Sequence, residues 1–590
     1  MKTIYSKIYH LLTLSERKGV LVLLILMMVG MLLETLGIGL IIPVVTLMMQ
    51  ADLASSYPVI IPILDYFERP SQTMLITAVM LGLVGVYFIK NLFLAFLIWK
   101  QTHFVYGVRV SLSHRLFAIY LRQPYTFHLQ RNSAELVRNV NGEVGAFTVA
   151  ISNAQLLIAE LMVLFGITIL LLLVEPMGAL IVAIVIGGAA WSFHRVTRAR
   201  ISKWGEERQF HDGLRIQHLQ QGLGGAKDVK LLGRESDFLA QYHTHNMKSA
   251  RVSKLHTVLQ NYPRLMFELL AVTGLAILVI SMLSQGRDMA SIIPTLGLFA
   301  AAAFRLMPSV NRVLSSAQAL RYNLPVVNML YEEVNLTSPE PVSQQAAGSP
   351  EVFRYELMLT NLKYQYIGAA LPALDGISIN IKKGETVGLI GASGSGKSTF
   401  IDVILGLLTP GAGLVEVDGQ DIQISLRQWQ DQIGYVPQSI YLTDDTMRRN
   451  IAFGLPKEQI NDAAVHRAIK AAQLEDFVNS LPDGMETIVG ERGVRLSGGQ
   501  RQRIGMARAL YHDPDVLVLD EATSALDTAT EMGVMQAVMA LHGEKTIIIV
   551  AHRLSTVKHC DRLYRLDKGK VIEEGTPAEL IPSIKNTTSN

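Results

Sequence analysis

The sequence contains a single cysteine, Cys560, among its 590 residues. A framework of disulfide bonds is therefore excluded, because even one intramolecular bond needs two cysteines. We expect the Cys560 thiol to be inert, as buried structural cysteines usually are. The sequence also lacks an obvious short tandem repeat and a strongly low-complexity tract. Neither a disulfide-rich scaffold nor a repeat array is therefore indicated.

Charged residues are also scarce. They make up 17% of the chain, half of the residues are hydrophobic, and the mean hydropathy is +0.30. This composition is too apolar for an ordinary soluble protein and too charged for a chain made only of membrane spans. The net charge of +3 is small and decides nothing by itself. At roughly 100–200 residues per domain, the length predicts three to five units, or fewer if one is large.

Long apolar runs cluster before residue 320. A span needs about 20 apolar residues to cross about 30 Å of hydrocarbon. The first run is too long and begins too late for a signal peptide, and no small-residue cleavage site follows it. The runs predict six membrane spans near 20–46, 74–99, 147–174, 177–192, 258–283 and 292–314.

Lysine and arginine are concentrated in the N-terminal segment and in the long segments after the second and fourth spans. Such segments stay in the cytoplasm, so we expect the N-terminus and both long segments on that side. The stretch "RVSLSHRLFAIYLRQ" repeats apolar residues at helical spacing. The spans are therefore predicted to continue as helices into the cytoplasm, where they could touch a soluble domain.

A soluble domain is predicted after the last span. We expect a transmembrane domain over 1–335, a polar, proline-containing linker over 336–350 and an α/β domain over 351–590. The stretches "ETVGLIG", "VLVLDEA" and "KTIIIVAH" are typical of buried parallel strands. The predicted fold class is thus a helical membrane domain fused to an α/β phosphate-loop domain.

The stretch "GASGSGKST" follows a predicted strand and opens a predicted helix, as a phosphate loop must. Glycines let backbone N–H groups close around phosphate oxygens, and the helix start adds a field that favours anions. We expect Lys397 to reach the β- and γ-phosphates and the Ser398 hydroxyl to bind Mg²⁺. The predicted ATP-binding residues of this loop are Gly391, Ser393, Gly394, Ser395, Gly396, Lys397, Ser398 and Thr399.

The stretch "DVLVLDEATSALD" delivers two carboxylates at the end of a buried strand, where open α/β sheets bind ligands. We expect Asp520 to bind Mg²⁺ and Glu521 to orient and deprotonate the attacking water.

A second anion-binding helix start is predicted at Ser497, Gly498 and Gly499 in "VRLSGGQRQRIGMARAL". One nucleotide needs only one such cradle, so this one is expected to bind the γ-phosphate of ATP held by another copy. The alternative is an ordinary helix N-cap with a glycine turn.

With "LSGGQRQR", the sequence closely resembles the ATP-binding-cassette family over its whole length. The resemblance implies an ATPase that uses ATP and Mg²⁺. Six spans and one cassette resemble a half-size exporter, which implies a homodimer in the lipid bilayer. It also implies coupling helices near 125–135 and 217–230. The resemblance implies that Tyr366 stacks on adenine, that Gln438 senses Mg²⁺ and water, and that His552 contacts the γ-phosphate. It also implies nucleotide binding by Gln500, communication across the dimer by Asp527, and an exporter-type acidic loop at Glu491.

Ionisable residues in the predicted spans are candidates for a substrate site, because such groups cost at least ~2.5–3.5 kcal/mol at membrane depth. The stretches "ETLGIGLIIPVV" and "FRLMPSVNRV" resemble bacterial flippases of lipid-linked oligosaccharides, whose basic side chains are thought to meet a pyrophosphate. The alternative is internal pairing, with Glu34 or Glu268 as partners, or snorkelling to the interface. The candidate substrate residues are Lys90, Arg264 and Arg305.

The favoured interpretation is an ATP-driven exporter or flippase in the bacterial inner membrane, working by alternating access. Its expected cargo is a lipid-linked oligosaccharide or a similar anionic amphiphile. Alternative cargoes for the same ATP-driven transporter are lipid A, a drug or another amphiphile. An alternative function is that of an ATP-gated channel or regulator. A secreted peptide is less favoured, because little chain precedes the first span. Soluble cassette proteins that act on nucleic acid are excluded by the spans, so no nucleic-acid partner is expected.

Overall fold

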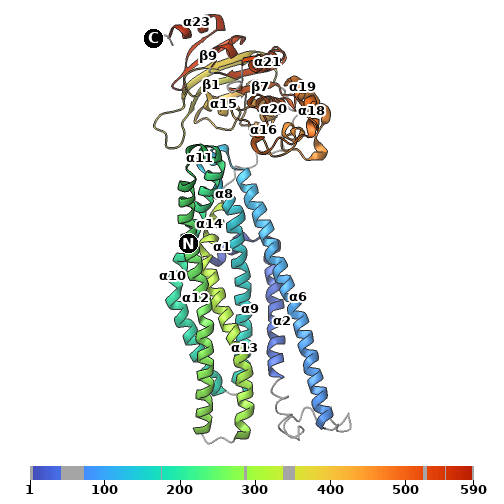
Figure 1. The fold of residues 1–590 in the computed structure, drawn as a ribbon, viewed down its shortest axis with the longest axis vertical. Coiled ribbons are helices and arrows are strands. Elements are labelled where there is room, and N and C mark those ends of the chain that lie inside the picture. The colour runs from blue at the N-terminus through green and yellow to red at the C-terminus, as the bar shows by residue number, and fades with distance from the viewer. Residues whose placement is uncertain are drawn as a thin grey trace. The chain divides into compact units, whose positions relative to one another are not determined.

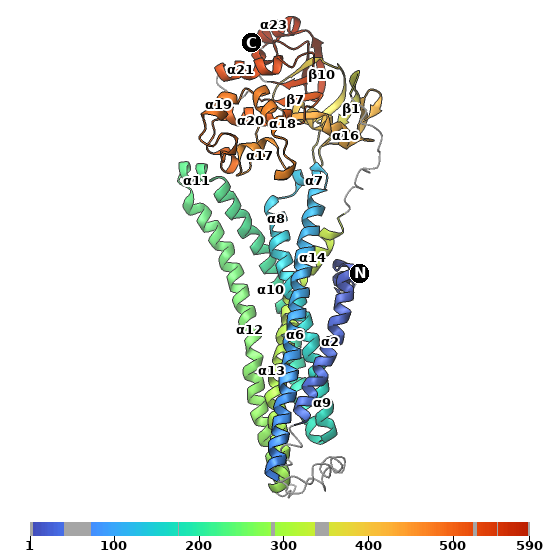
Figure 2. The ribbon, with the colours of Figure 1, turned by 90° about the vertical axis from the view of Figure 1, so that its right-hand side faces the viewer.

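The computed structural model describes residues 4–40, 72–174, 176–284, 289–336, 353–522, 528–551 and 553–587. The chain divides into two compact units (Figure 1, Figure 2). The predicted linker lies outside the described residues except for Leu336, and the domain boundaries stay a prediction. The first unit consists of Met1–Gln123 with Gln130–Ser338, and the second of Pro124–Leu129 with Pro339–Asn590.

The first unit is helical throughout its described residues, apart from short turns. Helices α6, α10 and α12 have 50, 49 and 50 residues. At 1.5 Å per residue each is about 75 Å long, whereas the hydrocarbon core is about 30 Å thick. The second, fourth and fifth predicted spans therefore lie in helices much longer than one membrane crossing requires, in agreement with the prediction for these three. The helices are α1 (Ile4–Leu11), α2 (Leu14–Gly39), α6 (Gln72–Leu121), α8 (Ser133–Arg138), α9 (Val144–Val174), α10 (Pro176–Gly224), α11 (Ala226–Leu232), α12 (Glu235–Ser284), α13 (Met289–Tyr322) and α14 (Leu324–Val334), with a π-helical turn η2 (Asn139–Glu143).

Within the described residues, three stretches are long and apolar enough to cross a membrane: Leu14–Gly39, Ile76–Leu121 and Ser133–Leu173. They overlap the first three predicted spans, although 41–46 of the first lie outside the described residues. The fourth, fifth and sixth predicted spans lie within α10, α12 and α13.

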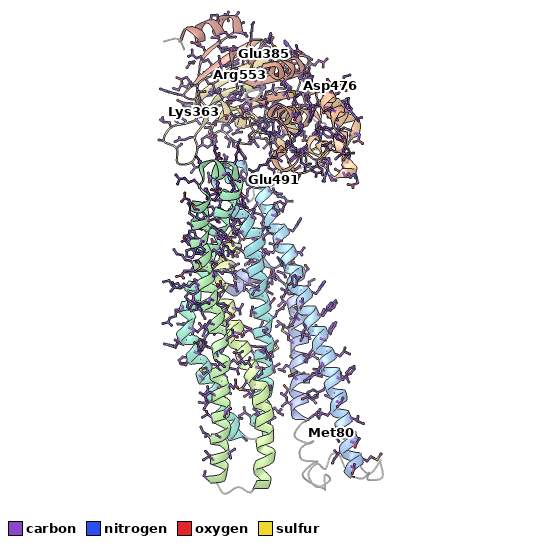
Figure 3. All side chains as sticks on the ribbon, in the orientation of Figure 1. Met80, Lys363, Glu385, Asp476, Glu491 and Arg553 are labelled. Carbon is purple, nitrogen blue, oxygen red and sulfur yellow. The ribbon has the colours of Figure 1, made fainter. Side chains whose placement is uncertain are left out.

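Apolar side chains project from α6 into the surroundings of the chain. Met80, Leu81 and Phe88 are 40%, 68% and 69% exposed, and Met80 lies near the N-terminal end of α6 (Figure 3). Such a surface is unfavourable in water and is typical of a helix that faces lipid or another subunit.

Other helices of this unit pack closely against one another. A Cβ added at Gly205 on α10 would lie 2.2 Å from the Tyr322 carbonyl oxygen on α13.

The second unit contains two sheets, whose strand orders are β10-β9-β3-β8-β7-β6 and β2-β1-β4-β5. In the larger sheet β3 (Thr386–Ile390), β8 (Thr546–Val550) and β7 (Val516–Asp520) pair in parallel. All residues of these three strands are buried, which explains their continuous apolar sequences. The predicted α/β domain is therefore confirmed.

The other strands are β1 (Glu356–Tyr364), β2 (Leu374–Lys382), β4 (Ala412–Val417), β5 (Gln420–Asp421), β6 (Ile433–Val436), β9 (Arg562–Asp567) and β10 (Lys570–Gly575). The helices are α15 (Lys397–Ile404), α16 (Leu426–Asp431), α17 (Met447–Ile451), α18 (Asp462–Ala471), α19 (Glu475–Ser480), α20 (Gly498–Leu510), α21 (Thr528–Met539), α22 (Leu554–Val557) and α23 (Pro577–Thr587), with α7 (Tyr125–Gln130) from the separate segment. Cys560 is buried in this unit, and burial raises the pKa of its thiol to about 12. That agrees with an inert thiol.

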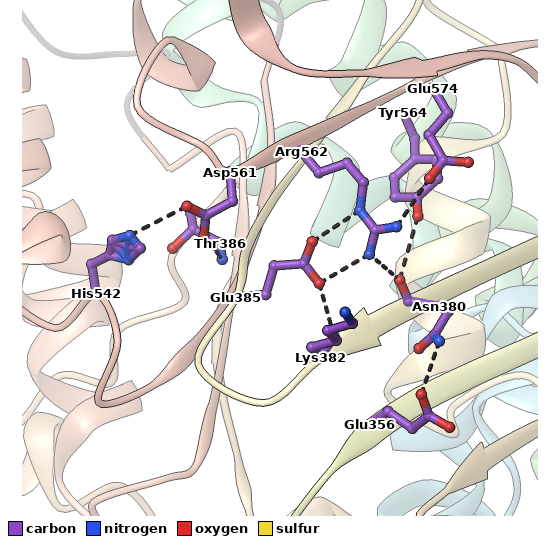
Figure 4. A network of polar contacts seen from close by, with 10 residues as sticks. All are labelled: Glu356, Asn380, Lys382, Glu385, Thr386, His542, Asp561, Arg562, Tyr564 and Glu574. Atoms are coloured by element: carbon purple, nitrogen blue, oxygen red, sulfur yellow. Dashed lines mark hydrogen bonds and ion pairs between the residues drawn. The ribbon is translucent and has the colours of Figure 1, made fainter.

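A polar network joins the two sheets of the second unit (Figure 4). Arg562 on β9 forms two hydrogen bonds, of 2.9 and 3.0 Å, with the Glu385 carboxylate. The same guanidinium donates to the Asn380 carbonyl oxygen on β2 and to Glu574 on β10. Because a guanidinium fork bonds several acceptors in fixed directions, Arg562 sets the position of β2 against β9.

We expect Arg562→Ala to destabilise the second unit by about 1.5–3 kcal/mol, the free energy typical of hydrogen bonds to charged groups. Calorimetry of the whole chain would show a lower unfolding midpoint for this unit. The matched control is Arg427→Ala, whose ion pair with Asp431 joins side chains that are 76% and 56% exposed. An equal shift in both variants would contradict the assigned role of the network.

Candidate nucleotide-binding site

The predicted phosphate loop lies between β3 and α15, at the carboxyl end of the parallel sheet. Two of its glycines are sterically required. Gly396 has a φ of +104° and its Cβ would lie 2.6 Å from the Ala373 carbonyl oxygen, and a Cβ at Gly391 would lie 2.3 Å from the Leu566 carbonyl oxygen. The loop can therefore approach a phosphate with its backbone while it packs tightly behind.

Lys397 is the first residue of α15 and is 5% exposed. Its Nζ donates hydrogen bonds to the carbonyl oxygens of Gly391 and Ala392, at 2.8 and 2.9 Å. Burial lowers the pKa of Lys397, although the charges of Glu521 and Asp520 oppose that shift. The ammonium group is thus held inside the loop, where it can bind phosphate as a compact charge.

The rest of the loop divides into exposed and buried residues. Ser393, Gly394 and Ser398 are exposed, whereas Ser395 and Thr399 are buried. The Thr399 hydroxyl lies 3.2 Å from the hydroxyl of Tyr366, the residue expected to stack on adenine. The structure thus places Tyr366 beside the loop.

The two predicted carboxylates follow one another at the end of β7. Asp520 is 8% exposed and is the last residue of the strand. Glu521 has a φ of +49°, a left-handed conformation that is strained for a residue with a side chain. Gln438 Nε2 donates a 2.7 Å hydrogen bond to Glu521 Oε2. The structure therefore brings together Gln438 and Glu521, which are 83 residues apart in the chain.

Asp402 on α15 is an acidic group of this site that the sequence analysis missed. Burial and the nearby charge of Asp520 raise its pKa to about 6. A usable signal was present, because Asp402 lies on the helix that the phosphate loop opens. Tyr435 on β6, whose hydroxyl is 3.5 Å from Asp520 Oδ2, was missed as well.

The predicted second cradle is the start of α20. Ser497 Oγ accepts from the Gln500 N–H at 3.2 Å, and Gln500 Oε1 accepts from the Ser497 N–H at 2.8 Å. This is a capping box, so the N-cap alternative describes the isolated chain correctly. The N–H groups of Gly498 and Gly499 belong to the first turn, which leaves such donors without partners in the helix. Binding of a second copy's ATP there stays a prediction.

Of the three remaining predicted residues, the structure describes Glu491. Glu491 begins a short 3₁₀ turn on the surface of the second unit (Figure 3). Asp527 and His552 lie outside the described residues.

Comparisons with known proteins cover both units. Residues 20–302 match the family "ABC transporter transmembrane region", and residues 374–524 match the family "ABC transporter". An ATP-dependent lipid A-core flippase of Cupriavidus metallidurans is 32% identical over 479 residues, 80% of each chain. Another, of Nitrosococcus oceani, is 30% identical over 540 residues, 88% of this chain and 87% of that protein.

The chain belongs to the ABC transporter family.

Its fold is that of an ABC exporter. The solved structure of a bacterial Atm1-family ABC exporter with ATP bound matches with a TM-score of 0.78 and 24% identity, over 96% of both chains. This ABC transporter is an ATP-hydrolysing translocase with one membrane region and one ATPase domain. That half-transporter architecture implies dimerisation.

The candidate substrate residues of the transporter differ in their surroundings. Lys90 on α6 is 7% exposed, and its Nζ lies 3.4 Å from Glu34 Oε2 on α2 and 4.1 Å from the centre of the Tyr87 ring. Internal pairing, one of the two alternatives, therefore describes Lys90 in this structure.

Arg264 and Glu268 on α12 are both exposed, and within the described residues no ion pair involves Arg264. Arg305 belongs to α13, but its side chain lies outside the described side chains.

One intramembrane ion pair was missed by the sequence analysis. Arg312 Nε on α13 lies 2.6 Å from Glu160 Oε1 on α9. Both residues stand inside predicted spans, so the signal that singled out Lys90 also applied to them. Their contact joins two helices of the membrane region.

We expect Glu521→Gln to slow ATP hydrolysis by about 10²–10⁴-fold, the usual contribution of a general base, while ATP binding is retained. Steady-state hydrolysis and nucleotide binding by the purified transporter would measure the two effects. The control is Glu458→Gln, which changes an exposed glutamate in the same way. Turnover close to that of the wild type would refute the role of Glu521.

Asp402 predicts a pH-dependent stability of the nucleotide-free ATPase domain. Its folded pKa of about 6 lies above the ordinary value of 3.8, so the folded state binds more protons between these values and the group destabilises it most above pH 6. We therefore expect Asp402→Asn to raise the unfolding midpoint more at pH 7.5 than at pH 5. An equal gain at both pH values would show that Asp402 does not titrate beside Asp520.

Proposed function

We propose that the chain works as a homodimeric, Mg²⁺-ATP-driven flippase of the bacterial inner membrane, with its ATPase domain in the cytoplasm. The observation that carries this proposal is an intact set of ATPase motifs in an exporter fold, in a chain about 30% identical to lipid flippases over most of its length.

The residues at the site fit Mg²⁺-ATP. The Ser398 hydroxyl, the Asp520 carboxylate and the Gln438 amide supply the oxygen ligands that Mg²⁺ prefers. Since the Gln438 amide nitrogen already donates to Glu521, its oxygen is the atom left to face a cation. Bound Mg²⁺ would neutralise charge that develops on the phosphates.

The chain's own residues have three tasks in this proposal. Lys397 and the loop backbone hold the phosphates, and Tyr366 stacks on adenine. Glu521, held by Gln438, orients a water and takes its proton. Ser497, Gly498 and Gly499 of the second copy close over the γ-phosphate, so ATP joins the two ATPase domains.

We propose an amphiphile with a phosphorylated headgroup as the cargo, and favour a lipid-linked oligosaccharide. Arg264 supports an anionic cargo, because an exposed guanidinium within a predicted span is costly unless it faces a cavity or a partner. Arginine also binds phosphate through two parallel hydrogen bonds. Lys90 is the weakest of the three candidates, because Glu34 already accompanies it.

Lipid A is the second candidate cargo. The named relatives are lipid A-core flippases, and lipid A also carries phosphate on a glycolipid. The test is ATP-dependent flipping by the purified protein in liposomes, with polyprenyl-pyrophosphate glycans, lipid A and a neutral drug as separate probes. Flipping of the drug alone would overturn the phosphorylated-cargo proposal, and absence of flipping of every probe would overturn the flippase.

We expect Arg264→Ala and Arg305→Ala to abolish the stimulation of ATP hydrolysis by a phosphorylated lipid, while basal hydrolysis is largely kept. The reason is that loss of the guanidinium removes a contact to the cargo and leaves the ATPase site unchanged. The control is Arg251→Ala, an exposed arginine of the same helix α12 outside the predicted span. Stimulation unchanged by either substitution would remove that arginine from the cargo site.

A further inference from the structure

The chain passes between its two units at only a few places. It enters and leaves the second unit around Pro124–Leu129, and it passes into that unit again after Ser338. Arg131 lies beside the first of these crossings, between α7 and α8, and Glu333 lies on α14 just before the second. Motion in the ATPase domain can reach the membrane helices covalently only through these crossings.

An ion pair joins the residues beside the two crossings. Arg131 Nη1 lies 3.3 Å from Glu333 Oε1 and 3.4 Å from Glu135 Oε1. The Glu333 side chain is 7% exposed and that of Arg131 is 33% exposed. A carboxylate so deeply buried needs a cationic partner close by, so Arg131 is bound firmly to this position.

Glu333 also contacts the membrane helices themselves. The Tyr120 hydroxyl near the end of α6 interacts with Glu333. That hydroxyl also accepts a 3.1 Å hydrogen bond from Nδ2 of Asn139, a fully buried residue of the π-helical turn η2. π-Helical turns are often found at functional sites. One carboxylate thus links α14, α6 and the segment that follows α7.

Helix α14 is fixed to the first unit by its apolar face. Val326, Val327 and Leu330 are at most 2% exposed, and α14 packs against α1, α6, α9 and α10. Lys7 Nζ on α1 donates a 2.8 Å hydrogen bond to Asn328 Oδ1. Because α14 is anchored to several membrane helices, a force applied to Arg131 is passed to the bundle and is not lost in a loose segment.

Stability alone is a poor explanation of the pair. A buried ion pair stabilises a protein little more than apolar residues of the same size would, because both charges lose their hydration. Its advantage is a directional, charge-specific contact between two segments. This one joins segments that are 202 residues apart, at the points where the chain passes between units.

We propose that Glu333 is a positioning residue for transport, and that its ion pair with Arg131 fastens the two crossings together so that ATP-driven movement is passed to the membrane helices. The inference rests on the proposed function, because it concerns the coupling of ATP hydrolysis to transport. Neither Glu333 nor Arg131 is one of the predicted ATPase-site residues or candidate cargo residues.

The test uses Glu333→Gln, Arg131→Gln and the double variant in the full-length transporter in liposomes. We expect basal ATP hydrolysis to be largely kept and the number of lipids flipped per ATP to fall about tenfold, within the 5–150-fold range typical of coupling between sites. The double variant should be no worse than the single ones, because all three break the same pair. The control is Lys203→Gln, which breaks a surface pair with Glu207 whose side chains are 74% and 41% exposed.

A second readout does not depend on the cargo. In a chain with Cys560→Ser, spin labels at Leu121 on α6 and Leu231 on α11, both exposed, would report whether the distance between them changes on addition of ATP. We expect that change to shrink in Glu333→Gln and Arg131→Gln, and to be restored in part by Arg131→Lys, which keeps the charge.

The outcomes separate this inference from the proposed function. A wild type that moves its labels with ATP and flips the neutral drug, but neither lipid A nor polyprenyl-pyrophosphate glycans, overturns the proposed cargo alone. The inference is overturned if the single variants show the wild-type label movement. It is also overturned if the loss of lipids flipped per ATP in the double variant equals the product of the losses in the two single variants. If Glu333→Gln fails to fold, the more exposed Arg131→Gln decides by the same measurements.

Discussion

The parallel strands β3, β7 and β8 are the constraint on which the ATPase site depends. They are buried throughout their lengths, so they are fixed relative to one another, and their carboxyl ends meet at one edge. The phosphate loop follows β3, and Asp520 ends β7 with Glu521 directly after it, which brings Lys397, Asp520 and Glu521 to the same edge. The strained backbone at Glu521 is held there by the sheet and by the hydrogen bond from Gln438.

Ion pairs between segments that are distant in the sequence fix further elements relative to one another. Arg562 and Glu385 join the two sheets of the ATPase domain. In the membrane region, Lys90 with Glu34 and Arg312 with Glu160 join helices. Each pair is at least partly buried, so losing one partner would leave a charge in an unfavourable surrounding. Arg264 differs, since it is exposed and within the described residues has no acidic partner, and this difference makes it the best candidate for contact with an anionic cargo.

The sequence predicted the features that depend on local order along the chain. The helical membrane region, the α/β domain and the loop with Lys397 follow from apolar runs and motif spacing, and the structure and comparisons confirm the fold. Pairings between distant segments could not be predicted, because no local pattern shows that Arg131 meets Glu333 or that Gln438 meets Glu521. The position of Asp402 on the helix after the phosphate loop was visible in the sequence, but its raised pKa was not, because that arises from burial and from Asp520, which is distant in sequence. The roles of Asp527, His552 and Arg305 rest on sequence alone.

We propose that ATP is bound between two copies, each of which supplies one half of the phosphate-binding groups. The most direct measurement is ATP hydrolysis per chain in lipid nanodiscs that hold either one copy or two. We predict that single-copy discs bind ATP but hydrolyse it at a small fraction of the two-copy rate, because in this proposal Ser497 and its helix start act on the ATP that the other copy binds. Equal rates per chain in the two preparations would contradict the claim.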